Sequence, residues 1–80
     1  MFRTLVRTDA LAIDDQTYAV RYFEVRTLRG ALRYSAEILL GKDDRIILDD
    51  DSLPNLEAKA ARLVPATVYS RVLARGATAA

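Results

Sequence analysis

Asp49-Asp50-Asp51-Ser52-Leu53-Pro54 divides the chain into two parts whose apolar residues recur with different periods. Before this junction apolar residues occupy every second position, as they do over 32–40. After it they recur every three or four positions, as they do over 53–68. A period of two is typical of strands and a period near 3.6 of helices. The pattern therefore predicts an α+β fold in which the sheet comes first and the helical segment last.

Turn-forming residues cut the first part into short strands. We predict turns at Asp14-Asp15, at Arg29-Gly30 and over 41–44, because Asp and Gly residues tolerate turn conformations. The strands between them are predicted over 2–7 (with a possible continuation to 13), 17–27, 31–40 and 45–49. Connections this short favour an antiparallel meander sheet of three to four strands.

The central hairpin predicts which side chains face the helix. A two-residue loop at Arg29-Gly30 would pair Leu28 with Ala31. This register puts the following residues on the helix-facing side: Phe23, Val25, Thr27, Leu32, Tyr34, Ala36 and Ile38. The opposite face then mixes charged residues with four apolar or aromatic ones: Tyr18, Val20, Tyr22 and Leu39. A solvated sheet face does not need so many apolar side chains, so we expect something to cover this part of it.

The helical segment is predicted from about residue 53 to 75. Ser52 or Asp51 can cap it, and Pro54 lies in the first turn, where its missing N–H costs nothing. The stripe expected to face the sheet comprises Leu53, Leu56, Ala60, Leu63 and Thr67 or Val68. Pro65 removes a helical hydrogen bond, which predicts a kink or a split into two helices. We expect 1–76 to form a single small α+β domain and 77–80 to be a disordered tail.

Composition limits what such a domain can do. The 80 residues carry a net charge of +1 and include no cysteine and no histidine, which excludes disulfides and zinc sites built from these ligands. A core this small is often supplemented by oligomerisation. No apolar stretch reaches the roughly 18–20 residues of a membrane span, and the N-terminus does not have the pattern of a secretory signal, so we expect a cytoplasmic protein. The excess of arginine over lysine favours a bacterial or phage origin.

The acidic residues have a structural and a chemical interpretation. Asp49-Asp50-Asp51 could hold Ca²⁺ or Mg²⁺ through carboxylate oxygens, but the following residues do not match a calcium loop. We favour a strand exit followed by a helix cap. Asp14-Asp15 and Asp43-Asp44 are expected to be exposed turns, which do not separate the pKa values of paired carboxylates as acid–base catalysis requires. Without histidine as a general base, we predict no enzyme activity, no cofactor and no small-molecule substrate.

Two functions remain. The first is protein interaction through Tyr18, Val20, Tyr22 and Leu39, either in a homodimer or as an adaptor or inhibitor of a larger protein. The alternative to a partner here is intramolecular cover by Phe2–Ile13. The second function is nucleic-acid binding through the arginines of the central hairpin, Arg21, Arg26, Arg29 and Arg33. The near-neutral charge of the chain argues against the second, because nucleic-acid affinity is mostly phosphate neutralisation.

Overall fold

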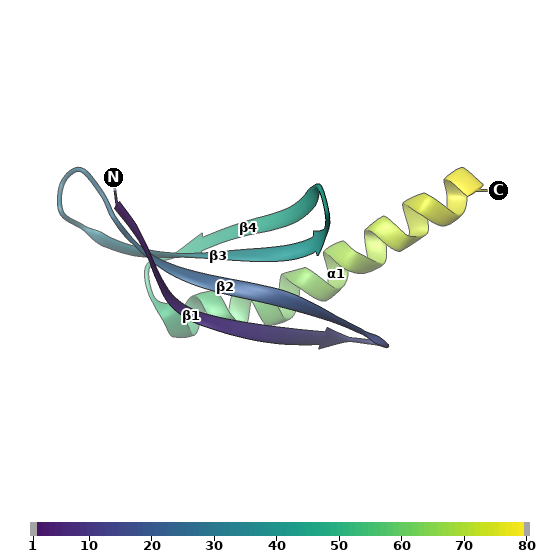
Figure 1. Ribbon diagram of the computed structural model, residues 1–80, viewed down its shortest axis with the longest axis horizontal. Coiled ribbons are helices and arrows are strands. Elements are labelled where there is room, and N and C mark those ends of the chain that lie inside the picture. Colours follow the sequence, from purple (N-terminus) through teal and green to yellow (C-terminus); the bar gives the residue numbers. More distant parts are fainter. Residues whose placement is uncertain (1, 80) are drawn as a thin grey trace.

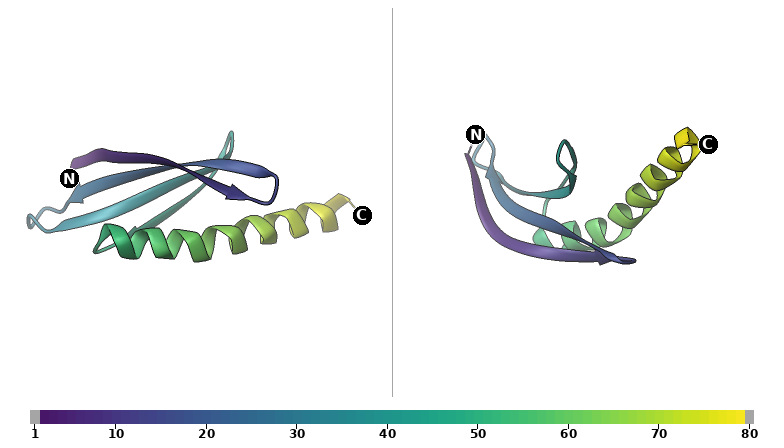
Figure 2. Two further views of the ribbon diagram at one scale, coloured as in Figure 1. Left: turned by 90° about the horizontal axis from the view of Figure 1, so that it is seen from below. Right: turned by 45° about the vertical axis from the view of Figure 1, so that its right-hand side comes forward.

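The protein is an antiparallel meander of four strands with one long helix on one face of the sheet (Figure 1). The computed structural model describes the backbone of residues 2–79 and the side chains of residues 3–74. The strands, which lie side by side in sequence order, are β1 (Phe2–Ile13), β2 (Gln16–Arg26), β3 (Leu32–Gly41) and β4 (Asp44–Asp50). α1 (Leu53–Ala79) follows β4 and lies against the sheet (Figure 2). The predicted α+β meander with a C-terminal helix is confirmed.

β1 is a single strand that includes the predicted continuation to 13, but it is irregular near its start. Leu5 pairs with Phe23 and Arg7 pairs with Tyr22, so Val6 is an extra residue in the ladder. A bulge of this kind changes which side chains point to each face. From Arg7 onward, alternate side chains of β1 therefore point to the same side of the sheet as Tyr22.

The connection between β2 and β3 is one residue longer than predicted. The Thr27 N–H donates to the Ala31 carbonyl over 2.9 Å, and the Ala31 N–H donates to Oγ1 of Thr27 over 3.1 Å. Gly30, inside this loop, has a φ of 81°, in the left-handed region. A three-residue loop that ends on a left-handed glycine is a common hairpin connection. The predicted register is wrong by one residue, since Val25 pairs with Arg33.

This difference exchanges the two faces of β2 and leaves those of β3 as predicted. Tyr18, Val20 and Tyr22 lie on the side that faces α1. Phe23 and Val25 point to the other side, which we call the outer face. The β3 side chains that pack toward α1 are predicted ones: Tyr34, Ala36 and Ile38.

The core is the contact between this sheet face and one ridge of α1. Leu56, Ala60, Val64 and Val68 recur every four residues and are all buried. They pack on four buried residues of β2 and β3: Val20, Tyr22, Ala36 and Ile38. Leu63 was predicted to face the sheet, but it is 37% exposed. Residues three and four positions after Ala60 both lie on its side of the helix. In this structure Val64, four positions on, is the one that is buried against the sheet.

α1 runs through Pro65 as one helix, so it is not split there. Pro65 has no N–H to donate to the carbonyl of Ala61, and Ala61 is exposed, so water can replace the donor. The helix continues to Ala79, beyond the predicted end near 75. Its 27 residues span about 40 Å, whereas the ten residues of β3 span about 33 Å. The last turns of α1 therefore extend past the sheet (Figures 1 and 2).

Candidate functional site

Most of the side chains predicted to bind a partner lie in the core. Val20 and Tyr22 are buried and Tyr18 is half-buried, all on the face covered by α1. Leu39 lies on the outer face, opposite Arg45 in the ladder. The prediction that these four residues share an uncovered face is wrong, because it depended on the register of the β2–β3 hairpin. The element that covers the first three is α1.

The four arginines of the nucleic-acid hypothesis do not gather on one surface. Arg21 and Arg33 lie on the outer face, whereas Arg26 lies on the other face and Arg29 is exposed in the β2–β3 loop. Nη2 of Arg21 lies 2.7 Å from the carboxylate of Glu37. Arg33 is also paired, as shown next, so half of the predicted set already contacts acidic groups.

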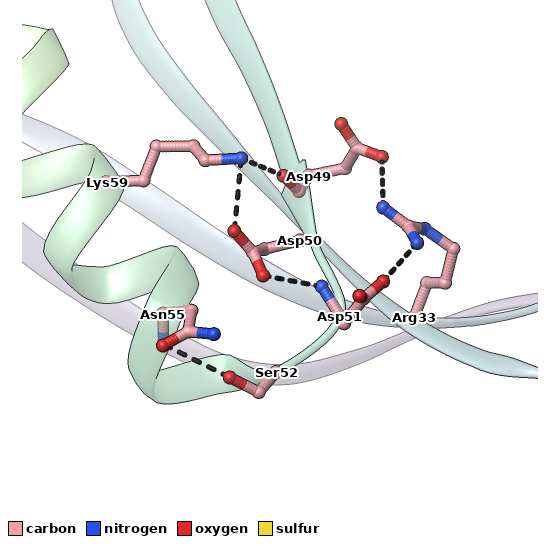
Figure 3. Close-up of polar contacts among 7 residues, drawn as sticks. All are labelled: Arg33, Asp49, Asp50, Asp51, Ser52, Asn55 and Lys59. Atoms are coloured by element: carbon pink, nitrogen blue, oxygen red, sulfur yellow. Dashed lines mark hydrogen bonds and ion pairs between the residues drawn. The ribbon is translucent and has the colours of Figure 1, made fainter.

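Asp49, Asp50 and Asp51 form an acidic junction in which each carboxylate has a cationic partner (Figure 3). Arg33 contacts Asp49 at 3.0 Å and also pairs with Asp51. Lys59 of α1 lies 3.1 Å from Asp50 and donates to the Asp49 carbonyl over 2.7 Å. Hydrogen bonds from Lys59 and from the Asp51 backbone N–H hold the pKa of Asp50 below its usual value. Within residues 2–79, no group of three or more acidic side chains is arranged to hold a metal ion.

The junction ends in the predicted helix cap. Oγ of Ser52 accepts a hydrogen bond from the Asn55 N–H over 3.3 Å (Figure 3), and the Ser52 carbonyl accepts from the Leu56 N–H over 3.0 Å. A serine in this position satisfies backbone N–H groups that the first turn of a helix leaves free. The acidic junction thus joins β4 to α1, and Lys59 holds the start of the helix against the end of the sheet.

A buried carboxylate lies at the centre of the outer face. Glu37 of β3 is only 3% exposed. One of its oxygens lies 2.7 Å from Arg21 of β2, and the other lies 2.9 Å from Arg45 of β4 and 3.8 Å from Arg3 of β1. We call these four residues the arginine cluster. Three guanidinium groups around one carboxylate leave two positive charges in excess within the cluster.

Arg3 also covers the aromatic ring of Phe23, with its guanidinium carbon 3.7 Å from the ring centre. This stacking explains why Phe23 is buried on a face that no other layer covers. A hollow of about 400 Å³ opens beside it, and its lining includes Arg3, Val25 and the ion-paired Arg33 and Asp49. The outer face therefore presents cationic groups next to apolar surface.

A second uncovered surface lies on α1 where the helix reaches the end of the sheet and passes it. The buried ridge that ends at Val68 continues, four residues on, with Val72, which is 51% exposed. Tyr69 and Leu73 are 65% and 55% exposed. Residues three and four apart lie on the same side of a helix. We call Tyr69, Val72 and Leu73 the helix patch.

The charged residues near the helix patch are basic on α1 and acidic in the β1–β2 turn. No Asp or Glu follows Glu57 in the sequence, so every charged residue of α1 after Glu57 is basic. The neighbouring β1–β2 turn is acidic, whereas the β3–β4 turn holds Lys42 beside Asp43 and is followed by Asp44, which pairs with Arg71 of α1. The other three acidic residues of these turns have no ion-pair partner among residues 3–74: Asp14, Asp15 and Asp43.

Sequence reasoning missed the helix patch and the buried state of Glu37. A signal for the patch was that Tyr69, Val72 and Leu73 follow the predicted sheet-facing stripe at helical spacing. Among the described residues, no helix is both long and apolar enough to cross a membrane. Comparisons with protein-family models, with curated proteins and with solved structures find no match to this chain.

Proposed function

We propose that the chain is a small, non-enzymatic protein-interaction module that binds its partner through the helix patch. The observation that supports this is the exposure of Tyr69, Val72 and Leu73 together on a helix that extends beyond its own sheet. Apolar side chains gathered on one exposed surface are typical of protein contacts, and tyrosine is enriched in them. The partner is a second copy of the chain or a larger protein for which the chain is an adaptor or inhibitor.

The residue types of the chain support a role without catalysis. The sequence offers no cysteine as a nucleophile and no histidine as a general base. Apart from Glu37, the described carboxylates are at least partly exposed to solvent. The proposal keeps the expectation, drawn from the sequence, of a cytoplasmic protein of bacterial or phage origin.

Photo-crosslinking in the native host tests the proposal. Replacing Tyr69 with the photoreactive p-benzoylphenylalanine should give a specific covalent adduct on irradiation. The same replacement at Leu28, which is 91% exposed in the loop at the opposite end of the sheet, is the matched control and should give none. Equal adduct formation at both positions, or none at Tyr69, contradicts the proposal.

Nucleic-acid binding is the second candidate, and the arginine cluster favours it. Arg3, Arg21 and Arg45 give the arginine cluster two excess positive charges, and the hollow with its apolar surface lies beside it. Guanidinium groups next to apolar surface suit single-stranded nucleic acid, whose phosphates are anionic and whose bases stack. This set replaces the hairpin arginines as the proposed contact, because Arg26 and Arg29 lie elsewhere.

Fluorescence polarisation with labelled single-stranded and duplex oligonucleotides at low salt tests the second candidate. Arg45→Gln, which changes the most exposed arginine of the cluster, should weaken binding and make it less sensitive to salt. Arg62→Gln on the exposed surface of α1 is the control and should bind as the wild type does. No binding of either oligonucleotide at low salt removes this candidate.

A further inference from the structure

We infer that the partner of the helix patch is a second copy of this chain, joined through antiparallel pairing of the two α1 helices about a two-fold axis near Val72. The inference rests on the proposed interaction function and adds the identity of the partner. Three features of the structure support it: the continuity of an apolar ridge, the distribution of charge, and the small size of the core.

The helix patch continues a surface that already packs well in each chain. Leu56, Ala60, Val64 and Val68 form the buried ridge, and Val72 is its next step. In an antiparallel pair, the patch of one helix faces the patch of the other, so each apolar side chain meets apolar side chains of the second copy. A two-fold contact of this kind uses the same residues on both sides, and it closes after two copies.

Charge favours the antiparallel direction. α1 runs toward the sheet end that carries the β1–β2 and β3–β4 turns, and then past it (Figures 1 and 2). Beyond the axis, the basic last turns of each α1 would return along the second copy toward its acidic β1–β2 turn. There Asp14 and Asp15 have no ion-pair partner within residues 3–74 of their own chain. A parallel pair would instead place positive helix ends beside one another, which costs free energy.

The size of the core supplies the third argument. The cluster between sheet and helix contains eight buried residues, two of them alanine. A domain of about 80 residues buries a smaller share of its surface than larger domains do, and it has little stability to spare. The chain has no cysteine for a disulfide, so apolar burial against a second copy is the remaining way to enlarge the core.

Sedimentation equilibrium over a range of concentrations measures the association directly. The wild type should reach twice the 8.9 kDa mass of one chain. Val72→Glu should weaken dimerisation by about tenfold or more, since it places a charge at the centre of the contact. Leu28→Glu is the matched control, because Leu28 lies at the other end of the sheet and should leave the dimer intact. Circular dichroism of both variants confirms that each is folded.

A single introduced cysteine tests the geometry, because the chain has none of its own. Val72→Cys should form a disulfide-linked dimer under mild oxidation much faster than Leu28→Cys does. Asp15→Lys should weaken association and reduce its dependence on salt. A wild type that stays monomeric at every concentration overturns the inference, as does a Val72→Glu variant that dimerises like the wild type. If the Tyr69 photo-adduct contains another protein, the proposed function stands while this inference fails.

Discussion

Arg7 of β1 lies over the ring of Tyr22, with its guanidinium carbon 4.6 Å from the ring centre. The same guanidinium lies 2.8 Å from Oε1 of Glu57 on α1. α1 packs mainly on β3 and β4, whereas β1 is at the far edge of the sheet. The contact through Arg7 therefore connects the first strand to the helix across a core tyrosine.

Replacing Glu57 with Gln should lower the free energy of unfolding only slightly. Both side chains of the Arg7–Glu57 pair are partly exposed, 38% and 43%, and ion pairs of this kind contribute about 0.2–1 kcal/mol. The loss should shrink at high salt. Arg7→Ala should cost more than Glu57→Gln, because it also uncovers the ring of Tyr22.

Urea denaturation at low and high salt measures these differences. Glu24→Gln is the control, since no ion pair is found for Glu24 among residues 3–74. Glu57→Gln should differ from it at low salt and match it at high salt. An unchanged stability for Arg7→Ala would show that the contact with Tyr22 contributes nothing.

Tyr22 should make the protein less stable at high pH. Burial raises the pKa of Tyr22 above its ordinary value, while a hydrogen bond from Arg7 opposes part of the rise. The folded state thus holds the phenol proton more tightly than the unfolded chain does. The resulting stability is complete below about pH 10, the ordinary pKa of tyrosine, and is lost as the pH rises through the folded value.

Urea denaturation of the wild type and of Tyr22→Phe over the alkaline range tests this pH dependence. The stability of the wild type should fall more steeply above about pH 10 than that of the variant, which has no proton to lose at this position. Parallel curves would mean that Tyr22 titrates alike in the folded and unfolded chains. Its ring would then not be desolvated beneath Arg7 and α1.

Leu56 and Leu63 should respond very differently to truncation. Leu56 is fully buried, and Leu56→Ala should cost about 2–5 kcal/mol through lost burial and the cavity left behind. Leu63 points away from the sheet, and Leu63→Ala should cost about 1 kcal/mol or less. Chemical denaturation compares them, and Leu56→Val serves if the alanine variant does not fold. Similar losses at both positions would contradict the packing of α1 described above.

The parts of the fold that depend on local pattern could be predicted from the sequence. The strands, their meander order and the Ser52 cap follow from periods of two, turn residues and capping chemistry that lie within a few positions of one another. The faces of β2 could not, because they depend on whether the loop before Ala31 contains two residues or three. Gly30 is compatible with a loop of either length. The hydrogen bond from Ala31 to the Thr27 hydroxyl is the local signal for the longer one.

The candidate surfaces depend on relations between elements, which a local pattern does not contain. Glu37 is buried because arginines from three other strands converge on it, and one of them, Arg3, lies on β1, which is not a neighbour of β3 in the sheet. The helix patch is exposed because α1 is longer than the sheet it covers. Tyrosine is a residue type enriched at protein interfaces, but the aromatic and apolar character of Tyr22 suits a core position equally well.

Gly30 and Gly41 should respond with opposite sign to replacement by alanine. Gly30 has a φ of 81°, and no atom lies within 4 Å of the Cβ that alanine would add, so the cost is conformational and should be about 1–2 kcal/mol. At Gly41 the added Cβ would meet only the Cβ of Asp44 at an ordinary 3.9 Å, and its φ is not in the left-handed region. Gly41→Ala should therefore stabilise by about 0.4–1 kcal/mol, because alanine reduces the freedom of the unfolded chain.

Gly30→Asn should recover part of the loss at position 30, since asparagine tolerates the left-handed region better than alanine. Urea denaturation of the three variants decides the matter: if Gly30→Ala is as stable as the wild type, the three-residue loop is wrong, and so is the register that places Tyr22 beneath α1.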